Sequence, residues 1–141
     1  MEKISSETTS AEKMGTNFLM AFDRKIVLAS ASNSRKRLLE SVGLNPEIVI
    51  SGVDEEDSKL NSLSPRDLVL TLAIMKAHTA KEKVKGDALI IGADSTFEFN
   101  GKSLGKPGSK DVAIARAKEI RGHYGLLHTG QCVIDTKAGI E

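Results

Sequence analysis

The chain of 141 residues contains one cysteine, three prolines and no tryptophan. A single cysteine, Cys132, excludes an intramolecular disulfide and a cysteine-rich zinc site. No apolar run approaches the roughly 20 residues that a membrane helix needs, so we expect no membrane partner. Aromatic residues make up only 4% of the chain. A hydrophobic core must therefore be built from Val, Ile, Leu and Ala.

The chain also has no excess of charge of either sign. Twenty Lys and Arg residues stand against 19 Asp and Glu, which leaves a net charge of +1. This balance gives no support to binding of nucleic acid through bulk charge, so we expect no nucleic-acid partner. The first residues lack the apolar stretch of a secretory signal, which favours a cytoplasmic protein.

Length and polarity together suggest one globular domain with a leader. Hydrophobic residues make up 40% of the chain and charged residues 28%, as in ordinary globular proteins. Residues 1–22 are rich in Ser, Thr, Glu and Lys without sustained periodicity, and we interpret them as a flexible leader. Residues 23–141 form the predicted domain. Its last residues, 136–141, resemble a turn that leads to a further strand, so we expect part of the domain to be missing after Glu141.

The order of the predicted elements favours an α/β fold with a mixed sheet. Strands are predicted at 25–29, 47–50, 88–92 and 126–136, and a hairpin at 96–99 and 102–104 around a type I′ turn at Asn100–Gly101. Helices are predicted after a cap at Ser32 or Asn33, from Ser64–Pro65 to about Lys85, and from Ser109 to about Ile120. We expect the first helix to turn Leu38, Leu39 and Val42 inward, and the second to bury a stripe of Leu68, Leu72, Met75 and Thr79.

The turn after the first strand, Ser30-Ala31-Ser32-Asn33-Ser34-Arg35, is a candidate anion site. Small residues let backbone N–H groups approach an anion, and the helix N-terminus that follows favours negative charge. Arg35 could donate charge-assisted hydrogen bonds to phosphate oxygens. The alternative is an ordinary capped helix with a solvated basic first turn. Basic residues are disfavoured at a helix N-terminus, which favours the anion.

Asp94 follows the most hydrophobic strand, at an edge of the sheet where α/β proteins bind ligands. A carboxylate at that position can hold a divalent metal or activate water. It can equally cap a turn, and the residue alone does not decide between the two. Glu55 lies in an acidic run at 54–57, which is a solvated loop unless the fold places Glu55 near Asp94.

Two lysines have unusual surroundings in the sequence. Lys76 lies among apolar residues of the second helix, where it either extends to solvent or points into a pocket. Lys106 lies in the loop Gly105-Lys106-Pro107-Gly108, which lacks the spacing of a phosphate-binding P-loop and by itself indicates a surface loop. His128 and Cys132 would lie roughly 13 Å apart on one strand, so we do not expect a zinc site.

Together these segments resemble the Maf-like nucleoside triphosphate pyrophosphatases. The opening signature of the family is similar to residues 26–32 with Arg35, its acidic motif to Val53-Asp54-Glu55, and its helix motif to Ala73-x-x-Lys76-Ala77. The central block is similar to Ile91-Gly92-Ala93-Asp94-Ser95 and to Gly101-x-x-Leu104-Gly105-Lys106-Pro107, and a later strand to His128-Thr129-Gly130. Five motifs in order are far more specific than any one of them.

The resemblance implies a mixed sheet flanked by helices with a cleft at the strand ends, an architecture like that of Maf proteins and inosine triphosphatases. It implies hydrolysis of a nucleoside triphosphate to a monophosphate and pyrophosphate with Mg²⁺ or Mn²⁺. It further implies a possible homodimer. By position, Asp94 matches the catalytic acid or base and Glu55 its acidic partner. The phosphate-binding positions match Ser30, Ser32, Arg35, Lys76 and Lys106.

Two positions depart from patterns common in the family. Ser34 replaces a familiar arginine, and Ser95 occupies a position that is often Thr or Gln. Both resemble positions associated with the choice of base, so the sequence leaves open whether a pyrimidine or a modified nucleotide is preferred. Two other hypotheses remain: a non-catalytic interaction protein of cell division or septum formation, and a nucleotide binder that is inactive because its C-terminal part is missing.

Overall fold

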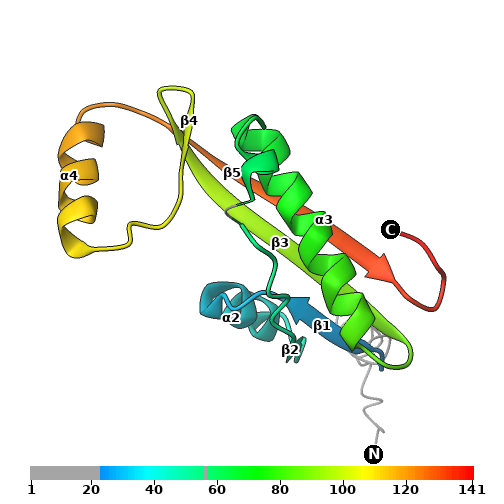
Figure 1. Ribbon diagram of the computed structural model, residues 1–141. Coiled ribbons are helices and arrows are strands. Elements are labelled where there is room, and N and C mark those ends of the chain that lie inside the picture. The colour runs from blue at the N-terminus through cyan, green and yellow to red at the C-terminus, as the bar shows by residue number, and fades with distance from the viewer. Residues whose placement is uncertain (1–22, 56) are drawn as a thin grey trace, which may run out of the picture.

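The computed structural model describes residues 23–55 and 57–141, and the predicted leader at 1–22 lies outside them. The strands are β1 (Lys25–Ala29), β2 (Glu47–Ile48), β3 (Ala88–Phe99), β4 (Lys102–Leu104) and β5 (Leu126–Asp135). The helices are α2 (Asn33–Ser41), the short 3-10 helix η1 (Ser58–Leu60), α3 (Pro65–Lys83) and α4 (Lys110–Ile120). This order confirms the predicted α/β class (Figure 1).

The sheet is mixed and has β3 at its centre. Strand β1 is parallel to β2 and β3, whereas β4 and β5 are antiparallel to β3. Strand β5 pairs with β3 along one edge, so β1 and β4 share the other. On that edge, β1 pairs with β3 as far as Gly92, and the pairing of β4 with β3 starts at Phe97. Residues 93–96 therefore have no strand of the described chain beside them on that edge, and we call this interval the β3 gap.

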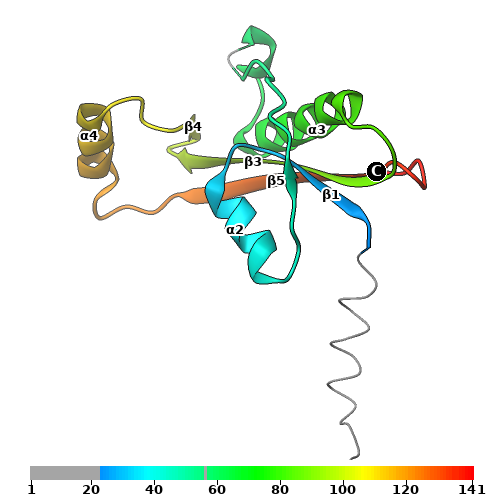
Figure 2. The same cartoon turned by 90° about the horizontal axis from the view of Figure 1, so that it is seen from below.

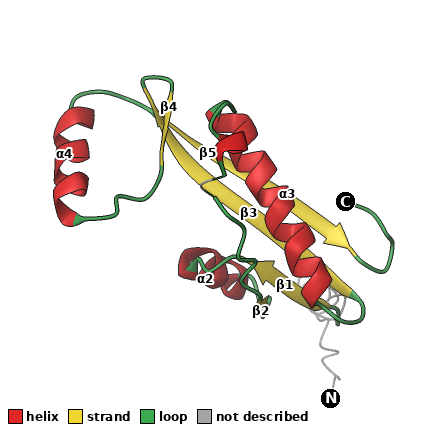
Figure 3. Ribbon diagram, in the orientation of Figure 1, coloured by secondary structure: helices red, strands yellow, loops and turns green. Residues whose placement is uncertain are grey.

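Strand β3 is one continuous element of 12 residues. The prediction of two separate strands at 88–92 and 96–99 is wrong. The reason is the long partner on the other edge: the ladder with β5 runs without interruption from Leu89↔Asp135 to Glu98↔Leu126. It keeps the small and polar residues of the β3 gap extended, as the two long strands in Figure 3 show.

Helix α3 covers one face of the sheet over β3 and β5 (Figures 1 and 2). Its start is as predicted, with Ser64 as the N-cap and Pro65 in the first turn. The predicted stripe is only partly correct: Leu72 is buried, but the other buried positions are Val69, Ala73, Lys76, Ala77 and Ala80. The helix is rotated toward its alanines because Gly92 of β3 lies directly against its backbone.

Helix α2 lies on the opposite face of the sheet (Figure 2). Ser32, one of the two predicted caps, is its N-cap. The inward orientation expected for Leu38 and Val42 is wrong, since Leu38 is 68% exposed and Val42 is 56% exposed, whereas Leu39 is half-buried. Within the described residues, Arg35 in the first turn supplies the side-chain hydrogen bonds that tie α2 to the sheet, while Leu38 and Val42 lie uncovered.

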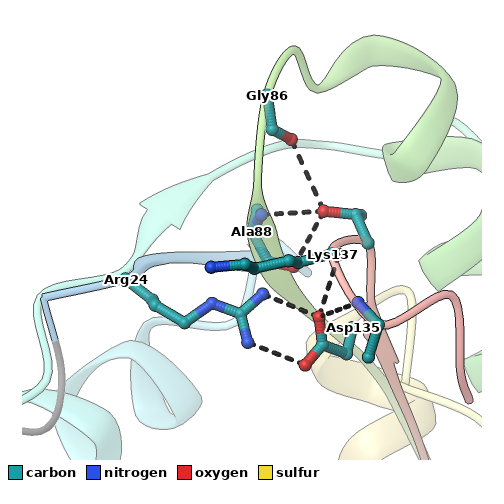
Figure 4. A network of polar contacts seen from close by, with 7 residues as sticks. Arg24, Gly86, Ala88, Asp135 and Lys137 are labelled. Atoms are coloured by element: carbon teal, nitrogen blue, oxygen red, sulfur yellow. Dashed lines mark hydrogen bonds and ion pairs between the residues drawn. The ribbon is translucent and has the colours of Figure 1, made fainter.

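An ion pair fastens the start of β1 to the end of β5 (Figure 4). The two terminal guanidinium nitrogens of Arg24, Nη1 and Nη2, each donate to the Asp135 carboxylate at 2.7 Å. The same carboxylate accepts from the amides of Lys137 and Ala138, which closes the turn after β5. The hydrogen bonds with Arg24 and with these amides hold the pKa of Asp135 far below its ordinary value, although partial desolvation opposes them.

Turn geometry elsewhere follows the predictions closely. Asn100 and Gly101 have φ values of 50° and 74°, as the predicted type I′ hairpin requires. Helix α4 begins at the predicted cap Ser109 and ends at Ile120. Strand β2 is shorter than the predicted 47–50 and ends at Ile48. Among the described helices, none is both long and apolar enough to cross a membrane.

Candidate functional site

The β3 gap collects most of the candidate residues. Strand β1 ends at Ala29, opposite Gly92, and the chain then leaves the sheet through Ser30 and Ser32 into α2. Asp94 and Ser95 lie in the gap itself. In open α/β sheets the carboxyl ends of parallel strands are where ligands bind, because the chain diverges there and leaves backbone and side chains accessible.

Arg35 bridges the turn after β1 and the β3 gap. One terminal nitrogen of its guanidinium donates to Ser30 Oγ at 3.0 Å and to the carbonyl of Ala93 at 3.1 Å. The other donates to Ser95 Oγ at 2.9 Å. All three acceptors are neutral oxygens, so these contacts orient the guanidinium without neutralising its charge. The geometry agrees with an arginine that presents positive charge to an anion.

The turn that carries Arg35 is also ordered by its serines. Ser30 Oγ, which is buried, accepts from the Ser32 amide at 3.3 Å. Ser32 Oγ accepts from the Arg35 amide at 3.4 Å, which is the N-cap hydrogen bond of α2. Both serines therefore shape the turn and place Arg35 at the start of the helix.

Lys76 holds two carboxylates together on the other side of β3. Its Nζ lies 2.7 Å from Asp94 Oδ1 and 2.6 Å from Glu55 Oε1. The Lys76 side chain is only 10% exposed, so it does not extend to solvent: it points at the strand. Lys76 thus brings Glu55 of the acidic loop close to Asp94. The sequence had allowed Glu55 a place in a site only if the fold made these two carboxylates neighbours. We call Glu55, Lys76 and Asp94 the acidic–lysine cluster.

The charge of Lys76 is stabilised by this arrangement. Burial is the largest single influence and lowers the pKa of Lys76, because it disfavours the ammonium. The hydrogen bonds and charges of Asp94 and Glu55 together outweigh that influence, so the pKa of Lys76 lies above its ordinary value. At neutral pH the cluster thus contains one cation and can supply positive charge beside a carboxylate.

The two groups of residues lie on opposite faces of the sheet. Successive side chains of a strand point to opposite faces, so Asp94 faces α3 while Ser95 faces α2. Their partners agree, since Lys76 belongs to α3 and Arg35 to α2. Figure 2 shows the two helices on either side of the sheet. In the described part of the chain, no strand pairs with the β3 gap on that edge, so both faces border the same unpaired strand edge.

Two candidates lie outside these contacts. Lys106 is exposed in the loop after β4, and Ser34 is exposed on α2. Within residues 23–55 and 57–141, no hydrogen bond or ion pair joins either of them to the other candidates. The Lys106 loop is held instead by α4, because Arg116 donates to the carbonyl of Gly105 at 2.6 Å.

Thr129 is a polar contact of the site that reasoning from single residues did not find. Its Oγ1 lies 2.8 Å from Ser95 Oγ, and the two residues are direct partners in the β3–β5 ladder. The sequence predicted a strand over Thr129 but left Ser95 between two predicted strands, so it could not show that the two residues pair. Thr129 belongs to the His128-Thr129-Gly130 segment that resembles a later strand of the family, but the resemblance implied no role for its side chain.

The carboxylate oxygens of the acidic–lysine cluster are the type of ligand that a hard divalent cation prefers. Mg²⁺ is commonly bound through one or two carboxylates together with substrate phosphates and water. Asp94 and Glu55 supply such carboxylates, and Glu55 is 55% exposed and accessible. Within the described ranges, no group of three or more His, Cys, Asp or Glu side chains is arranged to hold a metal ion by itself.

The comparison with protein families decides where this chain belongs. A family model described as Maf-like protein matches residues 25–141, which include every element from β1 to β5. The chain belongs to the Maf-like family. The mixed sheet and flanking helices agree with that assignment, which the five sequence motifs had also indicated.

Curated relatives of this Maf-like chain carry the name nucleoside triphosphate pyrophosphatase. One from Streptomyces coelicolor is 48% identical over 118 residues, which are 82% of this chain and 56% of the relative. Another from Streptomyces avermitilis is 46% identical over 115 residues, 80% of this chain and 54% of the relative. A third from Rippkaea orientalis is 45% identical over 116 residues, 82% and 55% respectively. The chain spans about half the length of the curated relatives it matches.

Proposed function

We propose that this Maf-like chain carries the phosphate-binding and catalytic residues of a nucleoside triphosphate pyrophosphatase. The reaction consumes one water and gives a nucleoside monophosphate and pyrophosphate. The observation that supports it most is the β3 gap, where Arg35 and the acidic–lysine cluster lie on the two faces of one strand segment. The names of the relatives support the same reaction.

The proposed roles follow from charge and position. Arg35 and Lys76 bind the phosphates and stabilise the charge that develops on the leaving pyrophosphate. Asp94 orients or deprotonates the attacking water, because a carboxylate that already accepts from Lys76 retains a second oxygen for water. Ser30 and Ser32 order the turn that presents Arg35. Ser34 and Ser95 are the proposed positions for discrimination of the base.

A divalent cation, Mg²⁺ or Mn²⁺, is part of the proposal. Asp94 and Glu55 are the residues that would hold it, together with phosphate oxygens of the substrate. When bound, such a cation neutralises phosphate charge and makes the phosphorus more electrophilic. The residues of the chain then have the tasks of fixing the triphosphate, which falls to Arg35 and Lys76, and of receiving the proton of water, which falls to Asp94.

Lys106 completes the proposed set through a second conformation of its loop. In the structure it lies in the exposed segment between β4 and α4. Glycines at 105 and 108 have space around them, and a second path of the loop would require release of the hydrogen bond from Arg116 to the Gly105 carbonyl. We propose that Lys106 reaches a phosphate when nucleotide is bound. A homodimer and a cytoplasmic location remain parts of the proposal that rest on the resemblance and on the sequence.

The test is release of pyrophosphate from a panel of nucleoside triphosphates with Mg²⁺ or Mn²⁺, including dTTP, UTP and methylated GTP. Asp94→Asn keeps the size of the side chain and removes its charge, so we expect turnover to fall by at least a hundredfold. Asp87→Asn is the matched control, since Asp87 precedes the opposite end of β3. Equal activity of the Asp94→Asn variant and the control would refute the assignment and favour a non-catalytic role.

A further inference from the structure

The hydroxyls of Ser95 and Thr129 form a pair next to Arg35. In an antiparallel ladder, residues that are directly opposite point to the same face of the sheet. Ser95 and Thr129 are opposite one another, and their hydroxyl oxygens lie 2.8 Å apart. Both therefore lie on the face that carries α2, and the contact chain Arg35–Ser95–Thr129 runs from α2 across β3 to β5.

The direction of one hydrogen bond in this chain is fixed. A guanidinium has only donors, so Ser95 Oγ must accept from Arg35, at 2.9 Å. A serine hydroxyl retains one proton and one further lone pair. It can donate to Thr129 Oγ1 or accept from it, and both arrangements hold the Ser95 side chain in the rotamer that meets Arg35. Without the Thr129 hydroxyl, Ser95 has one partner fewer and is exposed on a strand.

Ser95 matters because it is one of only three oxygens that orient the Arg35 guanidinium in the described contacts. The other two, Ser30 Oγ and the carbonyl of Ala93, are bound by the same terminal nitrogen. Among the described residues, Ser95 alone binds the second terminal nitrogen and so fixes the rotation of the planar group. A rotated guanidinium presents different N–H groups to a phosphate and loses bidentate geometry.

We propose that Thr129 is a positioning residue for phosphate binding, which acts on Arg35 through Ser95. The proposal deepens the proposed function and rests on it. It assigns to β5 a part in the site, although the side chain of Thr129 need not touch the substrate.

The experiment uses the 141-residue chain and inorganic pyrophosphate as the probe. Thr129→Val removes the hydroxyl, keeps the shape and suits a strand. One net hydrogen bond corresponds to a change of about threefold to tenfold in the dissociation constant, so we expect pyrophosphate to bind that much more weakly by calorimetry. Thr129→Ser keeps the hydroxyl and should restore binding. The NMR resonance of the Arg35 side-chain N–H, identified by its loss in Arg35→Lys, should shift in Thr129→Val and return in Thr129→Ser.

A double-mutant cycle separates action through Ser95 from direct contact. If Thr129 acts through Ser95, Thr129→Val should have no further effect on pyrophosphate binding in a Ser95→Ala background. Thr136→Val is the control for lost stability, because the Thr136 hydroxyl binds the Ala88 amide far from the site. It should lower the melting temperature and leave the Arg35 resonance unchanged.

Two results would overturn the proposal: an Arg35 resonance that does not respond to Thr129→Val, or a full loss of affinity from Thr129→Val in the Ser95→Ala background. The first would show that Arg35 is oriented without Thr129, and the second that Thr129 binds the ligand itself. Failure of the proposed function looks different. In that case the wild-type chain would release no pyrophosphate from any nucleotide, while the resonance would still report whether Thr129 positions Arg35.

Discussion

Gly92 sets the distance between α3 and β3, and its substitution tests whether that contact supports the site. A Cβ built at Gly92 would lie 2.1 Å from the carbonyl oxygen of Ala73 and 2.8 Å from the amide nitrogen of Ala77. Both atoms belong to the backbone of α3, so no rotamer change relieves the overlap. Since Cβ atoms essentially never approach heavy atoms closer than 3.0 Å, the helix must move outward by about 0.9 Å.

The expected cost of Gly92→Ala follows from that displacement. Overpacking in a core usually costs about 1–3 kcal/mol, and contact with backbone places this case near the upper end. A loss of about 3 kcal/mol in the free energy of unfolding corresponds to a melting temperature that is lower by roughly 10 °C for a domain of this size. The outward movement also separates Lys76 from Asp94, so binding of pyrophosphate should weaken in the same variant.

Gly105→Ala is the matched control, because a Cβ at Gly105 meets nothing within 4 Å and its φ is not positive. Urea denaturation followed by circular dichroism gives the free energy of unfolding of both variants. We expect the free energy of unfolding of Gly105→Ala to lie within about 0.5 kcal/mol of the wild-type value. If Gly92→Ala were as stable as Gly105→Ala, the close approach of α3 to β3 would be refuted, and with it the geometry that places Lys76 at Asp94.

Three further predictions concern charge and turn geometry. Because the pKa of Lys76 is raised in the folded state, its ion pairs stabilise the chain fully at every pH below the ordinary lysine pKa. The difference in melting temperature between the wild type and Lys76→Met should therefore stay constant from pH 6 to 9 and shrink above about pH 10. Because the pKa of Asp135 is lowered, Arg24→Ala should destabilise the chain at neutral pH, and thermal melts should show this difference disappearing as the pH falls well below 4. Gly101→Ala places a side chain at a φ of 74°, and denaturation should show a cost of about 1 kcal/mol, whereas an unchanged stability would contradict the hairpin geometry.

Local signals in the sequence were sufficient for most element boundaries. The caps Ser32, Ser64 and Ser109 each begin a helix, and Asn100–Gly101 forms the expected turn. These features depend on a few adjacent residues, whose hydrogen bonds and φ values are decided locally.

Features that depend on partners distant in the sequence were not predictable. The small and polar residues at 93–96 interrupt the apolar run, yet the ladder with β5 keeps them in the strand. Leu38 and Val42 look like core residues by spacing, but the described chain offers them no surface to cover. Whether an apolar side chain is buried depends on the element that packs against it, and the periodicity of the sequence does not identify that element.

The candidate site shows the same division. The sequence identified Arg35, Lys76 and Asp94 as residues of interest but left each with an ordinary alternative. The structure decides the alternative for Lys76, because its ammonium lies between two carboxylates instead of in solvent. Only the fold could bring Glu55 to Asp94, since they lie 39 positions apart in the sequence with helix α3 between them. The contact of Thr129 with Ser95 could not be predicted from the sequence, because a shift of one residue in the strand register would turn Thr129 to the other face of the sheet.

The most direct test of the central claim is to identify the products of nucleotide hydrolysis by the 141-residue chain. Chromatography of the reaction with the preferred nucleoside triphosphate should show the monophosphate and pyrophosphate in equal amounts. Asp94→Asn should form both at least a hundredfold more slowly, while Asp87→Asn should form both at the wild-type rate. A nucleoside diphosphate with inorganic phosphate would contradict cleavage between the α and β phosphates. The same products from Asp94→Asn at the wild-type rate, or no product from the folded wild-type chain across the panel, would contradict the proposal that the β3 gap of this chain carries the reaction.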